Sequence, residues 1–133
     1  MAREREARTQ EECRALLSDQ LPFQFRDPGD PRIDAMRAEL DQMVFSPDVL
    51  RAAANSDYGA IDVEDRLGAV THPVLVLAGR HDRTCSLAGA RAIAEGVPGA
   101  ELVILENSAH MTYIEEEDAY LAAVGDFLAR RAR

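Results

Sequence analysis

Two side chains able to exchange a proton follow successive apolar segments of the chain. Asp82 comes four residues after the apolar run at 73–78, and His110 comes five residues after the run at 101–105. A carboxylate that accepts the Nδ1 proton of an imidazole fixes its tautomer, leaves Nε2 free as a base and stabilises the imidazolium. The pair therefore indicates the acid–base half of a nucleophilic triad, with aspartate before histidine in the chain.

The segments around these residues predict a small parallel sheet. The run at 73–78 is continuously apolar, as expected of a strand covered on both faces. Ser86 caps a predicted helix that reaches about residue 95, a second strand covers 101–105, and a last helix covers about 114–131. This βαβα order predicts an α/β fold class.

This topology brings the two candidate residues together. Ligands of open parallel sheets bind outside the carboxyl ends of the strands, and neighbouring strands lie about 4.8 Å apart. We therefore expect Asp82 and His110 to meet at one edge of the sheet. Each has a plainer alternative when taken singly, since an aspartate after a strand often forms a turn or caps a helix.

The first half of the sequence predicts helices and loops. The predicted elements are helices at 2–20, 31–44 and 47–54, a loop at 55–59 and a helical turn at 63–67 closed by Gly68. Prolines and a glycine at 21–31 should stop the first helix, with Asp30 capping the second and Ser46 capping the third. Apolar residues at steps of three and four along 33–44 indicate a packing face.

Composition excludes several classes of partner. The 133 residues carry 15 arginines, no lysine and 24 acidic side chains, for a net charge of −9. Such acidity argues against nucleic acid or an anionic membrane as partner. Two cysteines are too few for a disulfide framework, and a charged N-terminus does not resemble a signal peptide. No apolar run is long enough to cross a bilayer, so we expect a soluble, cytoplasmic protein.

The remaining histidines and cysteines offer little sign of a cofactor. Three histidines without paired cysteines or His-x-x-x-His spacing predict no metal site, and we expect no cofactor. We expect His81 to be a solvated loop residue and His72 to lie at the opposite end of the first strand. Cys85 is either a substitute nucleophile at a helix start or, as we favour, a small packing residue.

Residues 61–128 resemble the C-terminal part of α/β-hydrolases, most closely the proline iminopeptidase-like branch. The resemblance is carried by PVLVLAGRHD, which ends on Asp82, and by SAHM, which contains His110. It implies that Asp82 is the triad acid and His110 the triad histidine. It further implies a helical cap-like segment at 1–59 and a C-terminal βαβα part of the core at 60–133.

The resemblance also implies an activity and a substrate. Family members cleave through a serine acyl-enzyme, and the branch releases an N-terminal residue, proline preferred, from small peptides. Cap carboxylates in that branch hold the free amino terminus of the substrate. Glu11 and Glu12 are therefore candidates for this role, with a solvated helix face as the alternative.

One part of the family pattern is missing from this sequence. No serine has the Gly-x-Ser-x-Gly flanks of the nucleophile elbow, and no glycine-rich oxyanion loop is present; the serines are Ser18, Ser46, Ser56, Ser86 and Ser108. Three readings stay open. The chain is the C-terminal portion of a proline iminopeptidase-like hydrolase, an esterase or carbon–carbon bond hydrolase of the same fold, or a non-catalytic fragment or interaction module. In the last case it would need an N-terminal partner chain or self-associate through the exposed edge of its sheet.

Overall fold

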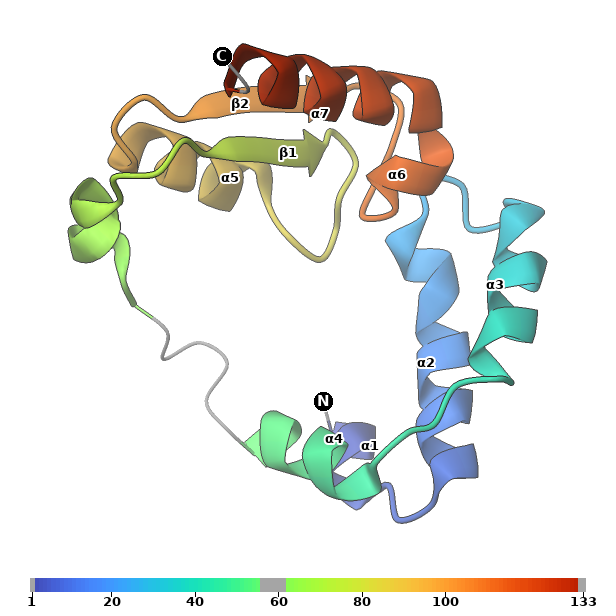
Figure 1. The fold of residues 1–133 in the computed structure, drawn as a ribbon. Coiled ribbons are helices and arrows are strands. Elements are labelled where there is room, and N and C mark those ends of the chain that lie inside the picture. Colours follow the sequence, from blue (N-terminus) through green and yellow to red (C-terminus); the bar gives the residue numbers. More distant parts are fainter. Residues whose placement is uncertain (1, 56–61, 132–133) are drawn as a thin grey trace. The chain divides into compact units, whose positions relative to one another are not determined.

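The computed structural model describes residues 2–55 and 62–131, which form two compact units (Figure 1). One unit comprises Met1–Pro22 with Asp27–Asp62, and the other comprises Phe23–Arg26 with Val63–Arg133. The predicted boundary at residues 59–60, and the predicted loop at 55–59 beyond its first residue, lie outside the described residues.

The second unit contains the predicted α/β arrangement. Its strands are β1 (Leu75–Gly79) and β2 (Glu101–Leu105), which pair in parallel from Leu75 opposite Glu101 to Gly79 opposite Leu105. The helices α5 (Leu87–Gly96) and α7 (Glu117–Arg131) cover opposite faces of this pair (Figure 1). A 3₁₀ helix, η2 (Glu64–Ala69), precedes β1 and includes Gly68, which was predicted to end it.

The predicted last helix is divided in two. A short helix α6 (Thr112–Glu115) comes first, and α7 begins after Glu116, whose φ of −132° and ψ of 54° leave the helical region. The carboxylate of Glu116 accepts the backbone N–H of Asn107 at 2.8 Å. The contact ties the residue between α6 and α7 to the loop that follows β2.

The first unit is helical throughout its described elements. These are α1 (Ala2–Glu6), α2 (Gln10–Gln24), α3 (Arg32–Leu40) and α4 (Pro47–Asn55). Its core contains Ala7, Cys13 and Leu16, with Phe45 and Leu50 packed against them. None of the helices described in the chain is both long and apolar enough to span a membrane.

The prediction of one helix over 2–20 was wrong because a capping box interrupts it. Thr9 Oγ1 accepts the backbone N–H of Glu12, and Glu12 Oε2 accepts that of Thr9, both at 3.1 Å. This reciprocal arrangement starts a new helix at Gln10. At its other end α2 continues through Pro22 to Gln24, so the prolines do not stop it where the sequence predicted. Leu21, next to the proline, is 3% exposed, so this end of α2 is packed rather than solvated.

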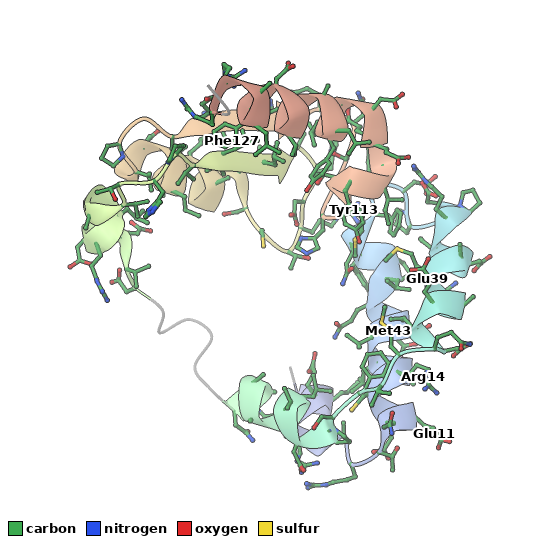
Figure 2. All side chains as sticks on the ribbon, viewed as in Figure 1. Glu11, Arg14, Glu39, Met43, Tyr113 and Phe127 are labelled. Carbon is green, nitrogen blue, oxygen red and sulfur yellow. The ribbon has the colours of Figure 1, made fainter. Side chains whose placement is uncertain are left out.

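In α3 and α4 the predicted capping side chains bond to backbone N–H groups, whereas the apolar face predicted over 33–44 does not reach its last residues. Ser46 Oγ accepts the backbone N–H of Val49 at 3.4 Å, as expected of the cap of α4, and Asp30 Oδ1 accepts that of Arg32 at 2.9 Å. However, α3 ends at Leu40, so Met43 and Val44 are exposed rather than part of a helical stripe. The side chains of the described residues are drawn in Figure 2, where Met43 is labelled.

Candidate functional site

The loops that follow β1 and β2 are joined beyond the end of the sheet. The backbone N–H of Arg80 donates to Leu105 O at 2.8 Å, and that of His81 donates to Ser108 O at 3.0 Å. Gly79 makes this approach feasible, because a Cβ atom there would lie 1.9 Å from the carbonyl oxygen of Ala109. The end of β1 and the loop leading to His110 therefore form one close-packed backbone layer.

Asp82 and His110 meet as the sequence predicts. Asp82 Oδ2 lies 2.9 Å from His110 Nδ1. Asp82 Oδ1 accepts the backbone N–H groups of Thr84 at 2.7 Å and Cys85 at 2.9 Å. One carboxylate oxygen is thus anchored to the turn before α5, which aims the other at the imidazole. The Asp82 side chain is 8% exposed and that of His110 35%, so the pair faces solvent through the imidazole.

The environment keeps Asp82 ionised. Burial by itself would raise the pKa of this carboxyl, but the N–H of Cys85, the His110 ring and the N–H of Thr84 hold the pKa below its ordinary value. An ionised carboxylate only accepts hydrogen bonds, so Nδ1 of His110 is the donor and Nε2 of a neutral ring is left as a base.

A short segment from the N-terminal half supports both loops. The carbonyl of Gln24 accepts the backbone N–H of His110 at 2.9 Å and that of Met111 at 3.3 Å. The guanidinium of Arg83, next to Asp82, donates to the carbonyls of Phe25 and Arg26, each at 3.2 Å. The segment Phe23–Arg26 therefore touches the aspartate loop and the histidine loop at once, and Phe25 is fully buried.

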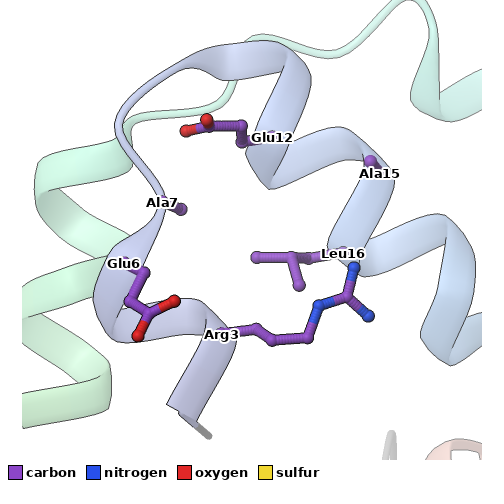
Figure 3. A pocket seen from close by; sticks show the side chains of 6 residues that line it. All are labelled: Arg3, Glu6, Ala7, Glu12, Ala15 and Leu16. Carbon is purple, nitrogen blue, oxygen red and sulfur yellow. The ribbon is translucent and has the colours of Figure 1, made fainter.

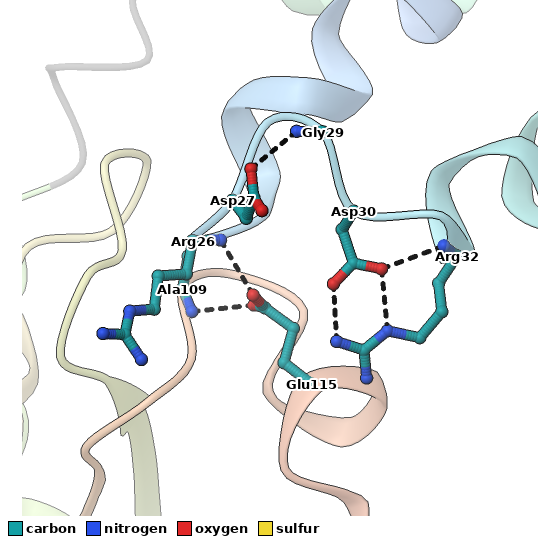
Figure 4. A network of polar contacts seen from close by, with 7 residues as sticks. All are labelled: Arg26, Asp27, Gly29, Asp30, Arg32, Ala109 and Glu115. Atoms are coloured by element: carbon teal, nitrogen blue, oxygen red, sulfur yellow. Dashed lines mark hydrogen bonds and ion pairs between the residues drawn. The ribbon is translucent and has the colours of Figure 1, made fainter.

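Glu115 completes this support. Its Oε1 accepts the backbone N–H of Arg26 at 2.8 Å, and its Oε2 accepts that of Ala109 at 2.7 Å (Figure 4). Glu115 lies in α6, at the start of the segment where the sequence predicted the last helix. Arg26 and Glu115 are 89 residues apart, and no local pattern signals a contact over that separation.

The two glutamates proposed to hold an amino terminus lie in the other unit. Glu11 is exposed on the first turn of α2 (Figure 2). Glu12 lines a pocket of about 230 Å³ together with Arg3, Leu16 and others (Figure 3). The backbone N–H groups of Arg8 and Thr9 donate to Glu12 and lower its pKa. Its carboxylate therefore already serves as a helix cap.

Cys85 is the one further side chain of metal-ligating type near the pair. Its Sγ, a ring nitrogen of His110 and a carboxylate oxygen of Asp82 lie within 4.8 Å of one another, and among the residues the structure describes no other such group of three occurs. His81 and His72 are both exposed and outside this group.

Comparison with a family model decides the relationship. The model described as TAP-like protein, one of the α/β-hydrolase models, matches residues 52–132, which include both loops. The chain belongs to this α/β-hydrolase family. The proline iminopeptidase-like resemblance and the α/β-hydrolase fold predicted from the sequence are confirmed.

Relatives of the chain carry the names of different hydrolases. A proline iminopeptidase of Saccharolobus solfataricus is 37% identical over 67 residues, which cover 50% of the chain and 21% of that protein. A 2-hydroxy-6-oxononadienedioate/2-hydroxy-6-oxononatrienedioate hydrolase of Cupriavidus pinatubonensis is 38% identical over 105 residues, covering 71% of the chain and 34% of that protein. The chain thus spans about a third or less of the length of these curated relatives.

A solved structure also matches most of the chain. The enol-lactonase from Burkholderia xenovorans LB400 matches with a TM-score of 0.71 and 29% identity, over 86% of this chain and 45% of that one. The chain is therefore similar over most of its length to just under half of a related hydrolase.

Proposed function

We propose that this chain supplies the acid and base of a proline iminopeptidase-like serine hydrolase, with Asp82 as triad acid and His110 as triad histidine. The observation that carries the proposal is the 2.9 Å contact between Asp82 Oδ2 and His110 Nδ1 beyond the carboxyl ends of β1 and β2. A half-exposed imidazole whose Nδ1 is held by an ionised carboxylate has the geometry of a general base.

The chemistry would run through a serine outside this sequence. His110 Nε2 takes the proton of the serine hydroxyl as that oxygen attacks the scissile carbonyl, and the imidazolium then protonates the leaving amine. In the second half, His110 takes a proton from water, which hydrolyses the acyl-enzyme and restores the serine. Asp82 stays ionised throughout and stabilises the imidazolium at Nδ1.

The substrate proposal is a peptide whose N-terminal residue, proline preferred, is released. Its support is the 37% identity to a protein named as a proline iminopeptidase. Of the two glutamates considered for the substrate amino group, Glu11 is the better candidate, because the carboxylate of Glu12 caps α2.

A second candidate is hydrolysis of an ester or a carbon–carbon bond by the same pair. The similarity to the Cupriavidus hydrolase covers more of this chain than the peptidase similarity does, 71% against 50%. The enol-lactonase structure also matches over most of the chain. In both candidates Asp82 and His110 keep the same roles, and the substrate differs.

Two chimeric enzymes test the role of the pair and separate the substrates. In one, the matched segment of the Saccharolobus peptidase is replaced by that of this chain; in the other, the matched segment of the Cupriavidus hydrolase is replaced. We expect turnover of a chromogenic proline amide by the first chimera and weak or no activity of the second on its own substrate. The reverse result would favour the carbon–carbon hydrolase reading.

Matched histidine variants within the active chimera test the assignment itself. His110→Ala should lower kcat by roughly 10⁶-fold, since triad members act as a unit and loss of the histidine costs about as much as loss of the whole triad. His81→Ala is the control, because His81 is exposed on the neighbouring loop and only its backbone contacts the site. Equal activity of His110→Ala and the parent chimera would refute the catalytic role of His110.

A further inference from the structure

Cys85 turns the aspartate–histidine pair into a three-donor cluster. Its backbone N–H donates to Asp82 Oδ1 at 2.9 Å, so the cysteine is held directly beside the carboxylate. Its Sγ lies within 4.8 Å of donor atoms of both Asp82 and His110. The thiol is exposed, whereas Cys13 is buried in the core of the other unit.

These three donors suit Zn²⁺ better than a hard cation. Thiolate, imidazole and carboxylate are the ligands that Zn²⁺ takes in proteins, while Mg²⁺ and Ca²⁺ prefer oxygen alone. At Zn–ligand distances of about 2.0 to 2.3 Å, tetrahedral donors lie roughly 3.3 to 3.8 Å apart. Because Cys85 is exposed, its side chain can close the remaining ångström without leaving a packed core.

We propose that Asp82, Cys85 and His110 bind one Zn²⁺ ion, with water at the fourth position. The ligands come from the two loops beyond β1 and β2, which is why histidine spacing along the sequence predicts no metal site. Zinc binding is independent of hydrolysis. Zn²⁺ held by Asp82 Oδ2 and His110 Nδ1 takes the place of the proton between those two atoms; the ring then carries its proton on Nε2, and the Cys85 thiol releases its proton to solvent. Its consequence for catalysis rests on the proposed function: Nε2 is then no longer a base, so Zn²⁺ inhibits the enzyme reversibly.

Titration of the purified chain tests the site directly. We expect one Zn²⁺ per chain by isothermal titration calorimetry. Loss of a residue that only supports a metal ligand typically weakens metal binding about 10- to 100-fold. Cys85→Ser and His110→Ala remove direct ligands, so each should weaken Zn²⁺ binding by at least that factor. Cys13→Ser and His81→Ala are matched controls and should leave the affinity unchanged.

Cobalt provides a second measurement, whose first arm uses the unaltered chain. Co²⁺ added to the unaltered chain should give a thiolate-to-metal charge-transfer band, and Cys85→Ser should abolish it. Absence of that band, or Zn²⁺ binding equally well to Cys85→Ser, would overturn the proposal. Equal weakening by Cys13→Ser or His81→Ala would also overturn it, because the ion would then lie elsewhere.

The chimera distinguishes failure of the metal site from failure of the proposed function. In an active chimera, Zn²⁺ should inhibit the parent at least tenfold more strongly than Cys85→Ser, a variant outside the hydrolytic machinery. An active chimera that Zn²⁺ inhibits equally with and without Cys85 would contradict the zinc site and leave the acid–base assignment standing.

Discussion

At the scale of the residue, the site depends on which partners the two oxygens of the Asp82 carboxylate bind. Asp82 gives Oδ1 to the backbone of its own turn and Oδ2 to the His110 ring. A turn-forming aspartate and an aspartate paired with a histidine are alternatives in the sequence, yet in the structure one side chain makes both sets of contacts. The turn contact makes the catalytic orientation rigid, because rotating the carboxylate would break two hydrogen bonds to N–H groups.

We expect the amide signals of Thr84 and Cys85 to report the ionisation of Asp82. The hydrogen bonds lower the pKa of this carboxyl in the folded chain, so their stabilisation is complete above the ordinary value of about 3.9 and is lost as the pH falls through the lower, folded value. NMR titration should therefore place the midpoint of both amide shifts below about 3.9. Asp82→Asn should remove the transition, and a midpoint above 3.9 would contradict the account.

At the scale of the element, parallel strand ends and a tight backbone contact position the pair. Gly79 lets the histidine loop lie on the end of β1, and Glu115 and the Phe23–Arg26 segment hold that loop from the other side. The segment belongs to the same compact unit as the sheet although it precedes it by some fifty residues. The histidine is thus fixed by its loop backbone as well as by Asp82.

Gly79→Ala should disrupt the site. A methyl group there meets the backbone carbonyls of Ala109 and Ser108, at 1.9 and 2.7 Å, and backbone cannot move aside as a flexible side chain can. We expect a loss of about 1–3 kcal/mol or more in the stability of the second unit, measured by amide exchange in β1 and β2, with displacement of the His110 ring signals.

Gly125→Ala is the matched control for this substitution. Gly125 lies in α7 with nothing within 4 Å of its added Cβ, so alanine there should stabilise the helix by up to about 1 kcal/mol. Equal tolerance of the two substitutions would show that the close approach at Gly79 is unimportant.

At the scale of the whole molecule, the sheet has an open edge. Within the described residues β1 pairs with β2 alone, and the apolar side chains of Leu75, Val76 and Leu77 are only partly buried. Two-stranded units of this kind are marginal, and an unpaired edge is a template for another strand. We propose that this edge pairs with the N-terminal part of a hydrolase or, in its absence, with a second copy.

Sedimentation velocity over a range of concentrations tests this proposal. The purified chain should self-associate as concentration rises. Val74 O accepts the N–H of Glu101, and the N–H of Arg80 donates to Leu105 O, so the backbone groups of Val74 and Arg80 face β2. Successive residues of a strand point their backbone groups to alternate sides, so the N–H of Leu75 points to the open edge. Leu75→Pro removes that donor at the first strand position, where proline is tolerated, and should weaken association. A monomer at every concentration would contradict the proposal.

Local patterns predicted the elements near the site well and those far from it less well. The second strand was predicted at its observed bounds, and Ser86 caps α5 through the N–H of Gly89 as expected. The errors in the first unit arose where a side chain makes a local contact that propensity does not reveal, as Glu12 does with Thr9. The sequence predicted that the prolines would stop the helix before Pro22, but α2 continues through Pro22 to Gln24.

The α/β class, the family and the two residues that meet follow from the sequence alone, because strand hydrophobicity and chain order require the two loops to leave the same edge of a parallel sheet. How the pair is held depends on tertiary contacts. Gln24 contacts His110 and Met111 across 86 and 87 positions, Arg26 contacts Glu115 across 89, and Cys85 approaches the His110 ring across 25. Such contacts arise from packing in three dimensions, and no spacing along the chain encodes them.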